Sequence, residues 1–174
     1  MTIHIPGDGR FKFREYEPRD KKVVGILRAI AHHEEPTPEW EKPPSDKLTH
    51  RTVVVEDVEE NSRVVGAARI IVTEPRLSHL QFVCVEEERR GQGLGTALLQ
   101  WVDNTSRNEC GAWAVELEVE RHNARAQELY RRHGYNHVPE HSSAAEKVWF
   151  NNPAIRRMLG APKVLRYVKQ LPRD

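Results

Sequence analysis

The chain has 174 residues, which is within the usual size of one domain. Its formal net charge is +1, so no overall field attracts nucleic acid or an anionic membrane, and no apolar run is long enough to span a bilayer. The N-terminus lacks the basic and apolar plan of a secretory signal, and Cys84 and Cys110 are interpreted as buried thiols rather than a disulfide. These features predict a cytoplasmic protein with one domain, 1–174, in which residues 1–10 form a loose leader.

The first half of the chain predicts a strand, a helix and a hairpin, in that order. Phe11–Tyr16 alternates apolar and polar residues, as a half-buried strand does. A helix is expected from Pro18 onward, and its buried face is predicted to comprise Val23, Ile26, Leu27 and Ile30. The proline-rich segment 36–44 is expected to be a loop or a broken helix. Residues 53–56 and 63–72 then predict two strands joined by a turn at Glu59–Ser62.

A glycine-rich stretch, Arg90–Gly95, lies between an apolar run, Leu80–Val85, and an apolar-periodic segment, Thr96–Val102. This order predicts a strand, a tight turn and a helix N-terminus. The turn would present unpaired backbone N–H groups and the positive end of the helix dipole, and glycines would let a ligand approach the backbone closely. Such a site favours a phosphate or pyrophosphate group.

Two familiar phosphate-binding motifs do not fit this stretch. A P-loop needs a lysine directly after its last glycine, but Thr96 follows Gly95. A dinucleotide-binding fingerprint counted from Gly91 and Gly93 needs a third glycine where Thr96 stands. The remaining pattern is an arginine, Arg90, followed by Gly93 and Gly95.

A second motif follows the glycine-rich stretch. Val115–Glu120 alternates apolar and acidic residues, which predicts a half-buried strand. Asn123 can cap the next helix and Gly134 can end it, so residues 124–133 are expected to be helical.

Together the two motifs resemble those of the GNAT N-acetyltransferase superfamily. The spacing of Arg90, Gly93 and Gly95 is similar to its acyl-CoA-binding signature. Its second motif is matched in order and spacing by Asn123, Ala126, Leu129, Tyr130, Gly134 and Tyr135. The resemblance extends from about Ser78 to Tyr135 and is closest to the branch that contains the N-terminal acetyltransferases of ribosomal proteins.

The resemblance implies an α/β fold with a mixed, mostly antiparallel central sheet that is flanked by helices. The sheet is expected to splay between its fourth and fifth strands, which would carry Val85 and Glu118. A short helix at Asn152–Gly160 and a closing strand at Val164–Lys169 are predicted from the sequence itself. Many proteins of this superfamily dimerise through their C-terminal strands, so a homodimer is compatible with the resemblance.

The resemblance also implies the chemistry. Acetyl-CoA would serve as acyl donor, without a metal, and a primary amine would attack it directly in a ternary complex. The amine could belong to a small molecule, a peptide or a protein. The alternative is a non-catalytic, regulatory acyl-CoA-binding module on the same fold. A nucleotide-phosphate-binding protein is disfavoured by the missing lysine after Gly95.

Two side chains are predicted to handle protons. The family motif implies that Tyr130 donates a proton to the departing sulfur, since a phenol stays protonated at neutral pH. The resembling acetyltransferases carry a glutamate base five residues before the asparagine of this motif, which implies Glu118 as the general base, while Glu116, Glu120 or a water molecule remain alternatives. Alternation places these carboxylates on one face, where mutual repulsion in a partly buried setting would raise a carboxyl pKa and improve the base.

The expected cofactor-binding residues lie on the strand, the glycine-rich turn and the second motif. Val83 and Val85 are expected to act through backbone groups, and Glu87 stands where the family usually has proline. Glu86–Glu88 is expected to face solvent, offset by Arg89 and Arg90. The full set is Val83, Cys84, Val85, Arg90, Gly91, Gln92, Gly93, Leu94, Gly95, Thr96, Asn123 and Tyr130.

Two further features are interpreted as surface. His133, His137 and His141 recur every four residues, but Gly134 and Pro139 would interrupt a helix that carried them, so no metal site is predicted. Basic residues after Lys147 have no aromatic stacking platform beside them, so no nucleic-acid partner is predicted.

Overall fold

The structure is a computed structural model, and it describes residues 9–32, 50–74, 76–138 and 164–172. The described strands form one sheet in the order β1-β2-β3-β4-β5-β7-β6. All neighbouring pairs are antiparallel except β4 and β5, which are parallel. The strands are β1 (Phe11–Glu15), β2 (His50–Asp57), β3 (Arg63–Glu74), β4 (Leu77–Val85), β5 (Ala114–Glu120), β6 (Asn136–Val138) and β7 (Val164–Gln170).

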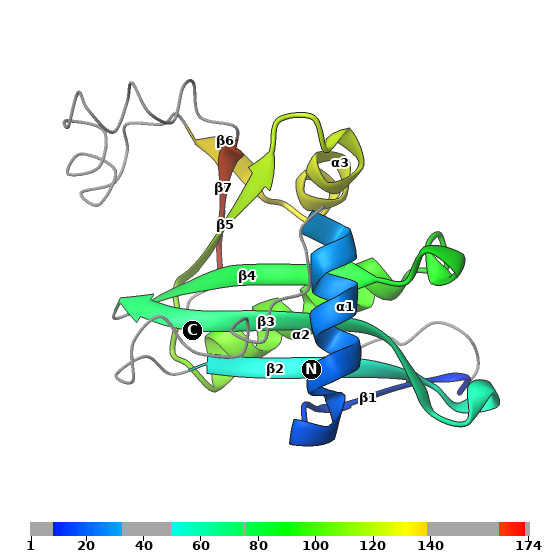
Figure 1. Cartoon of the computed structure of the whole chain (residues 1–174). Helices are drawn as coiled ribbons and strands as arrows, with labels where there is room; N and C mark the ends of the chain where they lie inside the picture. Colours follow the sequence, from blue (N-terminus) through cyan, green and yellow to red (C-terminus); the bar gives the residue numbers. More distant parts are fainter. Residues whose placement is uncertain (1–8, 33–49, 75, 139–163, 173–174) are drawn as a thin grey trace, which may run out of the picture.

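Three α-helices accompany the described sheet: α1 (Lys21–His32), α2 (Leu94–Asn108) and α3 (Ala124–Arg132). In Figure 1, α1 crosses one face of β2, β3 and β4, and α2 lies behind them. The core is divided accordingly, with α2 contributing Leu98 and Val102 to one cluster and α1 contributing Val24 and Leu27 to the other. Burying each such aliphatic side chain contributes about 1.5–3 kcal/mol, so docking on the sheet stabilises both helices.

The predicted buried face of α1 is partly wrong. Leu27 is buried as expected, but Ile26 and Ile30 are 38% and 56% exposed, and Val24 is fully buried instead. Val24 and Leu27 pack with residues of β3 and β4 such as Ala67 and Phe82. Successive helical residues are about 100° apart, so the side chains of Val24 and Leu27 point in a different direction from those of Ile26 and Ile30. Docking on the sheet buries the stripe through Val24 and Leu27, which the apolar pattern of the helix did not single out.

The other predicted elements within the described residues are confirmed, with longer bounds for most strands and helices. The hairpin turn holds Asn61 and Ser62 at positive φ. The short strand β6 is an element that the sequence did not indicate. The proline-rich segment 36–44, the helix at 152–160 and most of the leader, 1–8, lie outside the described residues. Among the helices that are described, none combines the length and apolar character needed to cross a bilayer.

The predicted splay between β4 and β5 is confirmed. The two strands pair only over Leu77–Leu80 and Ala114–Leu117, and beyond that point they share no register. Figure 1 shows β5 leaving β4 at a steep angle while β2, β3 and β4 continue side by side. Beyond the splay, β4 stays paired with β3, and β5 stays paired with β7.

A buried carboxylate at the end of β2 joins the segment before β1 to the segment after β4. Asp57, at the end of β2, has no exposed side-chain surface and accepts hydrogen bonds from Arg10 at 2.7 Å and Arg89 at 2.9 Å. The hydrogen bonds from Arg10, opposed by burial and supported by those from Arg89, lower the pKa of Asp57 to about 2. Arg89 also pairs with Glu60, so the hairpin turn and the segment after β4 are joined by charge-assisted bonds.

We predict that Asp57→Asn destabilises the protein in a pH-dependent way. The folded-state pKa lies below the usual value of 3.8, so the carboxylate's stabilisation is complete above about pH 4 and is lost as the pH falls through about 2. Urea unfolding midpoints of the native protein and the variant should therefore differ at pH 7 and converge toward pH 2. Glu59→Gln is the control, because this exposed carboxylate contacts the same Arg10 at 3.3 Å. A gap that stays constant from pH 7 to pH 2 would contradict the prediction.

Candidate functional site

The splay opens into a cleft with a volume of about 890 Å³. One wall is β4 from His79 to Val85, and the facing wall is the end of β5 from Glu118 to Glu120. The glycine-rich turn and α3 complete the lining. Of the predicted site residues, the cleft is lined by Val83, Cys84, Val85, Arg90, Gly91, Gly93, Leu94, Gly95, Thr96, Glu118, Asn123 and Tyr130. Gln92 is not among the lining residues, and its side chain donates to the carbonyl of Glu88.

The glycine-rich turn has the backbone that the sequence predicted. Gly91 and Gly93 have φ values of +79° and +82°, a region that residues with a Cβ atom rarely adopt. Gly93 directly precedes α2, whose first N–H groups lack intrahelical partners. At Gly95, a Cβ atom would lie 3.2 Å from Leu129 of α3, so the small residue lets the two helices approach. This geometry fits a bound pyrophosphate.

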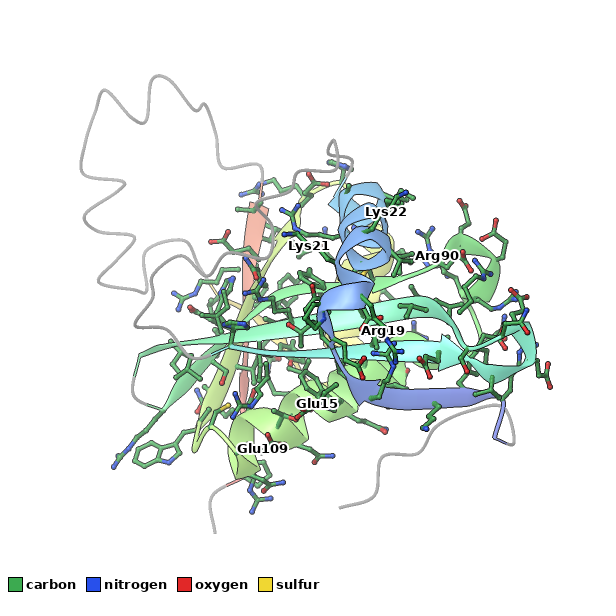
Figure 2. All side chains as sticks on the ribbon, turned by 60° about the horizontal axis from the view of Figure 1, so that its bottom comes forward. Glu15, Arg19, Lys21, Lys22, Arg90 and Glu109 are labelled. Atoms are coloured by element: carbon green, nitrogen blue, oxygen red, sulfur yellow. The ribbon has the colours of Figure 1, made fainter. Side chains whose placement is uncertain are left out.

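Two side-chain contacts hold the turn, one at each of its ends. Arg90 Nε donates to the Val85 carbonyl at 3.2 Å, and the Thr96 hydroxyl lies 3.1 Å from His133 Nε2. Arg89 pairs instead with Asp57 and Glu60. The expectation that Arg89 would compensate the negative charge of Glu86–Glu88 is therefore wrong. Figure 2 shows Arg90 beside the turn, far from Glu109, which follows the other end of α2. These contacts fix the turn before any ligand arrives.

The β4 wall offers backbone groups to the cleft. The Glu86 N–H donates to Val65 of β3 at 2.8 Å. Backbone groups alternate in direction along a strand, so those of Cys84 face β3, while those of Val83 and Val85 face the side that β5 has left. The Cys84 thiol contacts the Ala67 carbonyl at 3.6 Å, and burial raises its pKa to about 12. A thiol with that pKa is not a nucleophile near neutral pH.

Tyr130 is the buried phenol of the cleft. It projects from α3, is 7% exposed, and packs with its ring centroid 5.9 Å from Tyr135 and 6.4 Å from Tyr167. Burial, together with nearby Cys84, raises the pKa of its hydroxyl. The phenol is therefore protonated at every pH at which the protein would act, so it is available as a donor.

The three carboxylates of β5 have different surroundings. Glu116 is half-buried, with Arg166 Nε at 3.0 Å and His79 Nδ1 at 3.6 Å. Burial alone would raise its pKa, but hydrogen bonds from His79 and Arg166 lower it, so the rise expected from repulsion does not occur at Glu116. Glu120 contacts His122 at 3.1 Å, and Glu118 is exposed and lines the cleft. Glu118 and Glu120 therefore both face the cleft, and Glu118 is the more exposed of the two.

Asn123 begins α3 as predicted, because its side chain accepts a hydrogen bond from the Ala126 N–H at 3.0 Å. Since it also lines the cleft, the same residue caps the helix and faces the ligand space. Within the described ranges, no group of three or more metal-ligating side chains comes together.

The sequence missed several residues of the site. His79, Gln81 and Ile30 line the cleft, and His133 holds Thr96. None of them belongs to a recognisable motif. The contact between His133 and Thr96 joins positions 37 residues apart, so no local pattern could have indicated it.

Comparisons with known proteins agree with this geometry. Residues 17–135 match the profile of the acetyltransferase (GNAT) family. This match covers more than half of the 174 residues, so the chain belongs to the GNAT acetyltransferase family. No curated protein matches the sequence significantly.

Solved structures share the fold at low sequence identity. A GNAT-family acetyltransferase from Staphylococcus aureus Mu50 is 14% identical with a TM-score of 0.72, covering 93% of this chain and 99% of its own. The ribosomal-protein-S18-alanine N-acetyltransferase of Escherichia coli is 17% identical with a TM-score of 0.69, covering 94% and 96%. Nourseothricin acetyltransferase is 20% identical with a TM-score of 0.65, covering 94% and 99%. At these identities the similarity demonstrates the fold alone.

Proposed function

We propose that this protein is an N-acetyltransferase that transfers the acetyl group of acetyl-CoA to a primary amine within a ternary complex. The observation that carries the proposal is the cleft between β4 and β5, which combines a glycine-rich turn at a helix N-terminus, inward-facing backbone groups, a buried phenol and an exposed carboxylate. Family membership implies acyl transfer to an amine, and the features of the cleft supply a role for each chemical step.

The residues of the glycine-rich turn would hold the pyrophosphate through the N–H groups of Gly91–Thr96. Arg90 and Asn123, which also line the cleft, would contact the cofactor between its phosphates and its thioester. Acetyl-CoA supplies an activated acetyl thioester, whose carbonyl carbon is the electrophile. The N–H group of Val83 or Val85 would polarise the thioester oxygen and stabilise the negative charge that develops on it.

Glu118 and Tyr130 would divide the proton transfers. An alkylammonium has a pKa near 10, so the amine must lose a proton before its nitrogen can attack, and Glu118 would accept that proton directly or through water. When the bond between carbon and sulfur breaks, Tyr130 would donate its phenolic proton to the departing thiolate. The carboxylate stands on β5 and the phenol on α3, so the two roles do not compete for one group.

The acceptor is proposed as a primary amine of a small molecule, a peptide or a protein. The motifs between Ser78 and Tyr135 favour the branch of ribosomal-protein N-terminal acetyltransferases, and one structural neighbour, at 17% identity, carries that activity in its name. A homodimer is compatible with the family, since many of its members dimerise through their C-terminal strands, and here β7 and the edge strand β6 end the described sheet.

Acetyl-CoA binding is the first test of the proposal. Calorimetric titration should show saturable binding of acetyl-CoA and none of ATP or NAD. Gly93→Asp should abolish that binding, because it adds a negative charge and a Cβ atom at φ +82°. Gly111→Asp is the matched control, since Gly111 also has a positive φ, +63°, but does not line the cleft. Equal affinity in the Gly93 variant would disprove the phosphate-binding role, and binding without turnover of any amine would favour the regulatory module.

Tyr130→Phe tests the proton donor. We expect kcat to fall by about 10²–10⁴-fold, while the KM for acetyl-CoA changes little, because only the leaving sulfur loses its donor. The rates are measured as thiol release with an amine found by screening polyamines, amino acids and short peptides. Tyr135→Phe is the control, because its hydroxyl donates to Asp103 at 3.1 Å and the residue does not line the cleft. An unchanged kcat in Tyr130→Phe would exclude the acid role.

Glu118→Gln tests the base. Turnover should fall by about 10²-fold or more, with acetyl-CoA affinity retained, because the amide cannot accept the proton. Glu120→Gln is the comparison, since this carboxylate lies two residues further on the same face of β5 and contacts His122. If both variants lose turnover equally, or if only Glu120→Gln does, Glu118 is not the base.

A further inference from the structure

A histidine outside the cleft contacts the glycine-rich turn at its helical end. His133 is the C-cap of α3; it is partly buried and is not among the residues that line the cleft. Its Nε2 atom lies 3.1 Å from the hydroxyl oxygen of Thr96, which stands in the first turn of α2 and does line the cleft. His133 therefore reaches the proposed phosphate site through the side chain of Thr96.

The Thr96 hydroxyl has only one proton to donate. A neutral imidazole nitrogen either donates or accepts a hydrogen bond, depending on which nitrogen carries the proton, and both nitrogens donate in the imidazolium. If Nε2 accepted from Thr96, the hydroxyl would present only lone pairs to an anionic oxygen in the cleft. If Nε2–H donates to Thr96, the hydroxyl proton is left for a phosphate. The state of the His133 ring thus decides whether Thr96 can bind an anion.

Three charged side chains from three elements surround the imidazole of His133. Burial, followed by Lys169 of β7 and then by Arg132 of α3, lowers the pKa of His133, while Asp103 of α2 opposes this effect. Lys169 and Asp103 also pair with each other. The ring is therefore mainly neutral near pH 7 in the free protein, and a negative charge placed beside Thr96 would raise its pKa.

We propose that His133 is a positioning residue for the diphosphate of the cofactor: its Nε2–H donates to Thr96, the Thr96 hydroxyl donates to a phosphate oxygen, and binding is coupled to proton uptake by the ring. This inference rests on the proposed use of acetyl-CoA. No residue that the structure describes bonds to Nδ1 of His133, so that nitrogen can gain or lose its proton without breaking a contact. One hydroxyl would separate the ring from the phosphate, a distance of roughly 5–6 Å, over which opposite charges still attract.

Cofactor affinity should increase as the pH falls. A group whose pKa is raised by binding strengthens binding below its pKa in the free protein, and this gain is lost as the pH rises through its pKa in the complex. The Kd should therefore fall by about three- to tenfold between pH 8 and pH 5.5, since a tenfold change corresponds to a shift of one pKa unit. The ligand is dephospho-CoA, which keeps the diphosphate but lacks the 3′-phosphate, a monoester that itself titrates near about pH 6.

The test measures this pH dependence by calorimetry in the native protein and in two variants of His133. His133→Gln keeps a donor N–H near the position of Nε2 but cannot titrate, so its Kd should match the native Kd at pH 8 and stay constant down to pH 5.5. His133→Ala removes the donor, so its Kd should be higher than the native Kd at every pH. Near pH 6 the binding enthalpy of the native protein should depend on the ionisation enthalpy of the buffer, because protons are taken up, and that of His133→Gln should not.

His122→Gln is the matched control, because His122 lines the cleft but is exposed and contacts Glu120. This variant should keep the pH dependence of the native protein. Thr96→Val should weaken binding and abolish the pH dependence, and adding His133→Ala to it should weaken binding no further.

Different results would overturn the inference and the proposed function. If the native protein binds dephospho-CoA with a Kd that is constant between pH 8 and pH 5.5, or if His133→Gln keeps the native slope, the inference is wrong while the proposed function stands. If the slope disappears in His122→Gln, His122 and not His133 is the titrating group. If the native protein binds neither acetyl-CoA nor dephospho-CoA, the proposed function and this inference both fail.

Discussion

The whole site depends on the point at which β4 and β5 stop pairing. Their parallel register ends at Leu80 and Leu117, and from there each strand keeps only its antiparallel neighbour, β3 or β7. Backbone N–H and C=O groups have to be satisfied when they are buried, so an edge left open inside a folded sheet requires another partner. Arg90 meets part of this need by donating to the Val85 carbonyl. The rest of the edge offers polar groups to an extended ligand, which an amide-bearing pantetheine arm could use.

An open cleft of this kind can bind phosphate only if its turn is held in place from outside. The turn itself has few side chains, because glycines occupy Gly91, Gly93 and Gly95. Its rigidity comes instead from residues around it: Arg89 reaches back to buried Asp57, and His133 reaches across from α3 to Thr96. Burial makes the charge-assisted bond between Arg89 and Asp57 less sensitive to salt than surface pairs are. The loop is thereby pre-organised by the hairpin on one side and by α3 on the other.

The parts of the site that the sequence predicted are those that depend on local geometry. Glycines at positive φ, the Asn123 cap and the alternation of β5 are all decided within a few residues, and each leaves a recognisable pattern. The splay and the role of Tyr130 were predicted only through resemblance to a family. Contacts between distant segments were not predictable: the register shift at Gln81 depends on β3, and the environment of Glu116 depends on Arg166, 50 residues away. The predicted buried face of α1 was partly wrong for the same reason, because contacts with the sheet decide which side chains of the helix are buried.

The ionisable groups on the walls of the cleft are held in different protonation states. Burial keeps the phenol of Tyr130 protonated, and it keeps the thiol of Cys84 protonated as well, so neither of these cleft side chains is a nucleophile near neutral pH. Across the cleft, Arg166 and His79 hold Glu116 ionised, which commits that carboxylate to structure and leaves Glu118 without a competing cation among the pairs described. In the proposed reaction, Glu118 and Glu120 at the end of β5 would attract an incoming ammonium locally, while Arg125 and Arg132 also line the cleft. In the proposed reaction, β5 would take the proton from the amine, α3 would supply one to the sulfur, and β4 would contribute backbone groups from across the split.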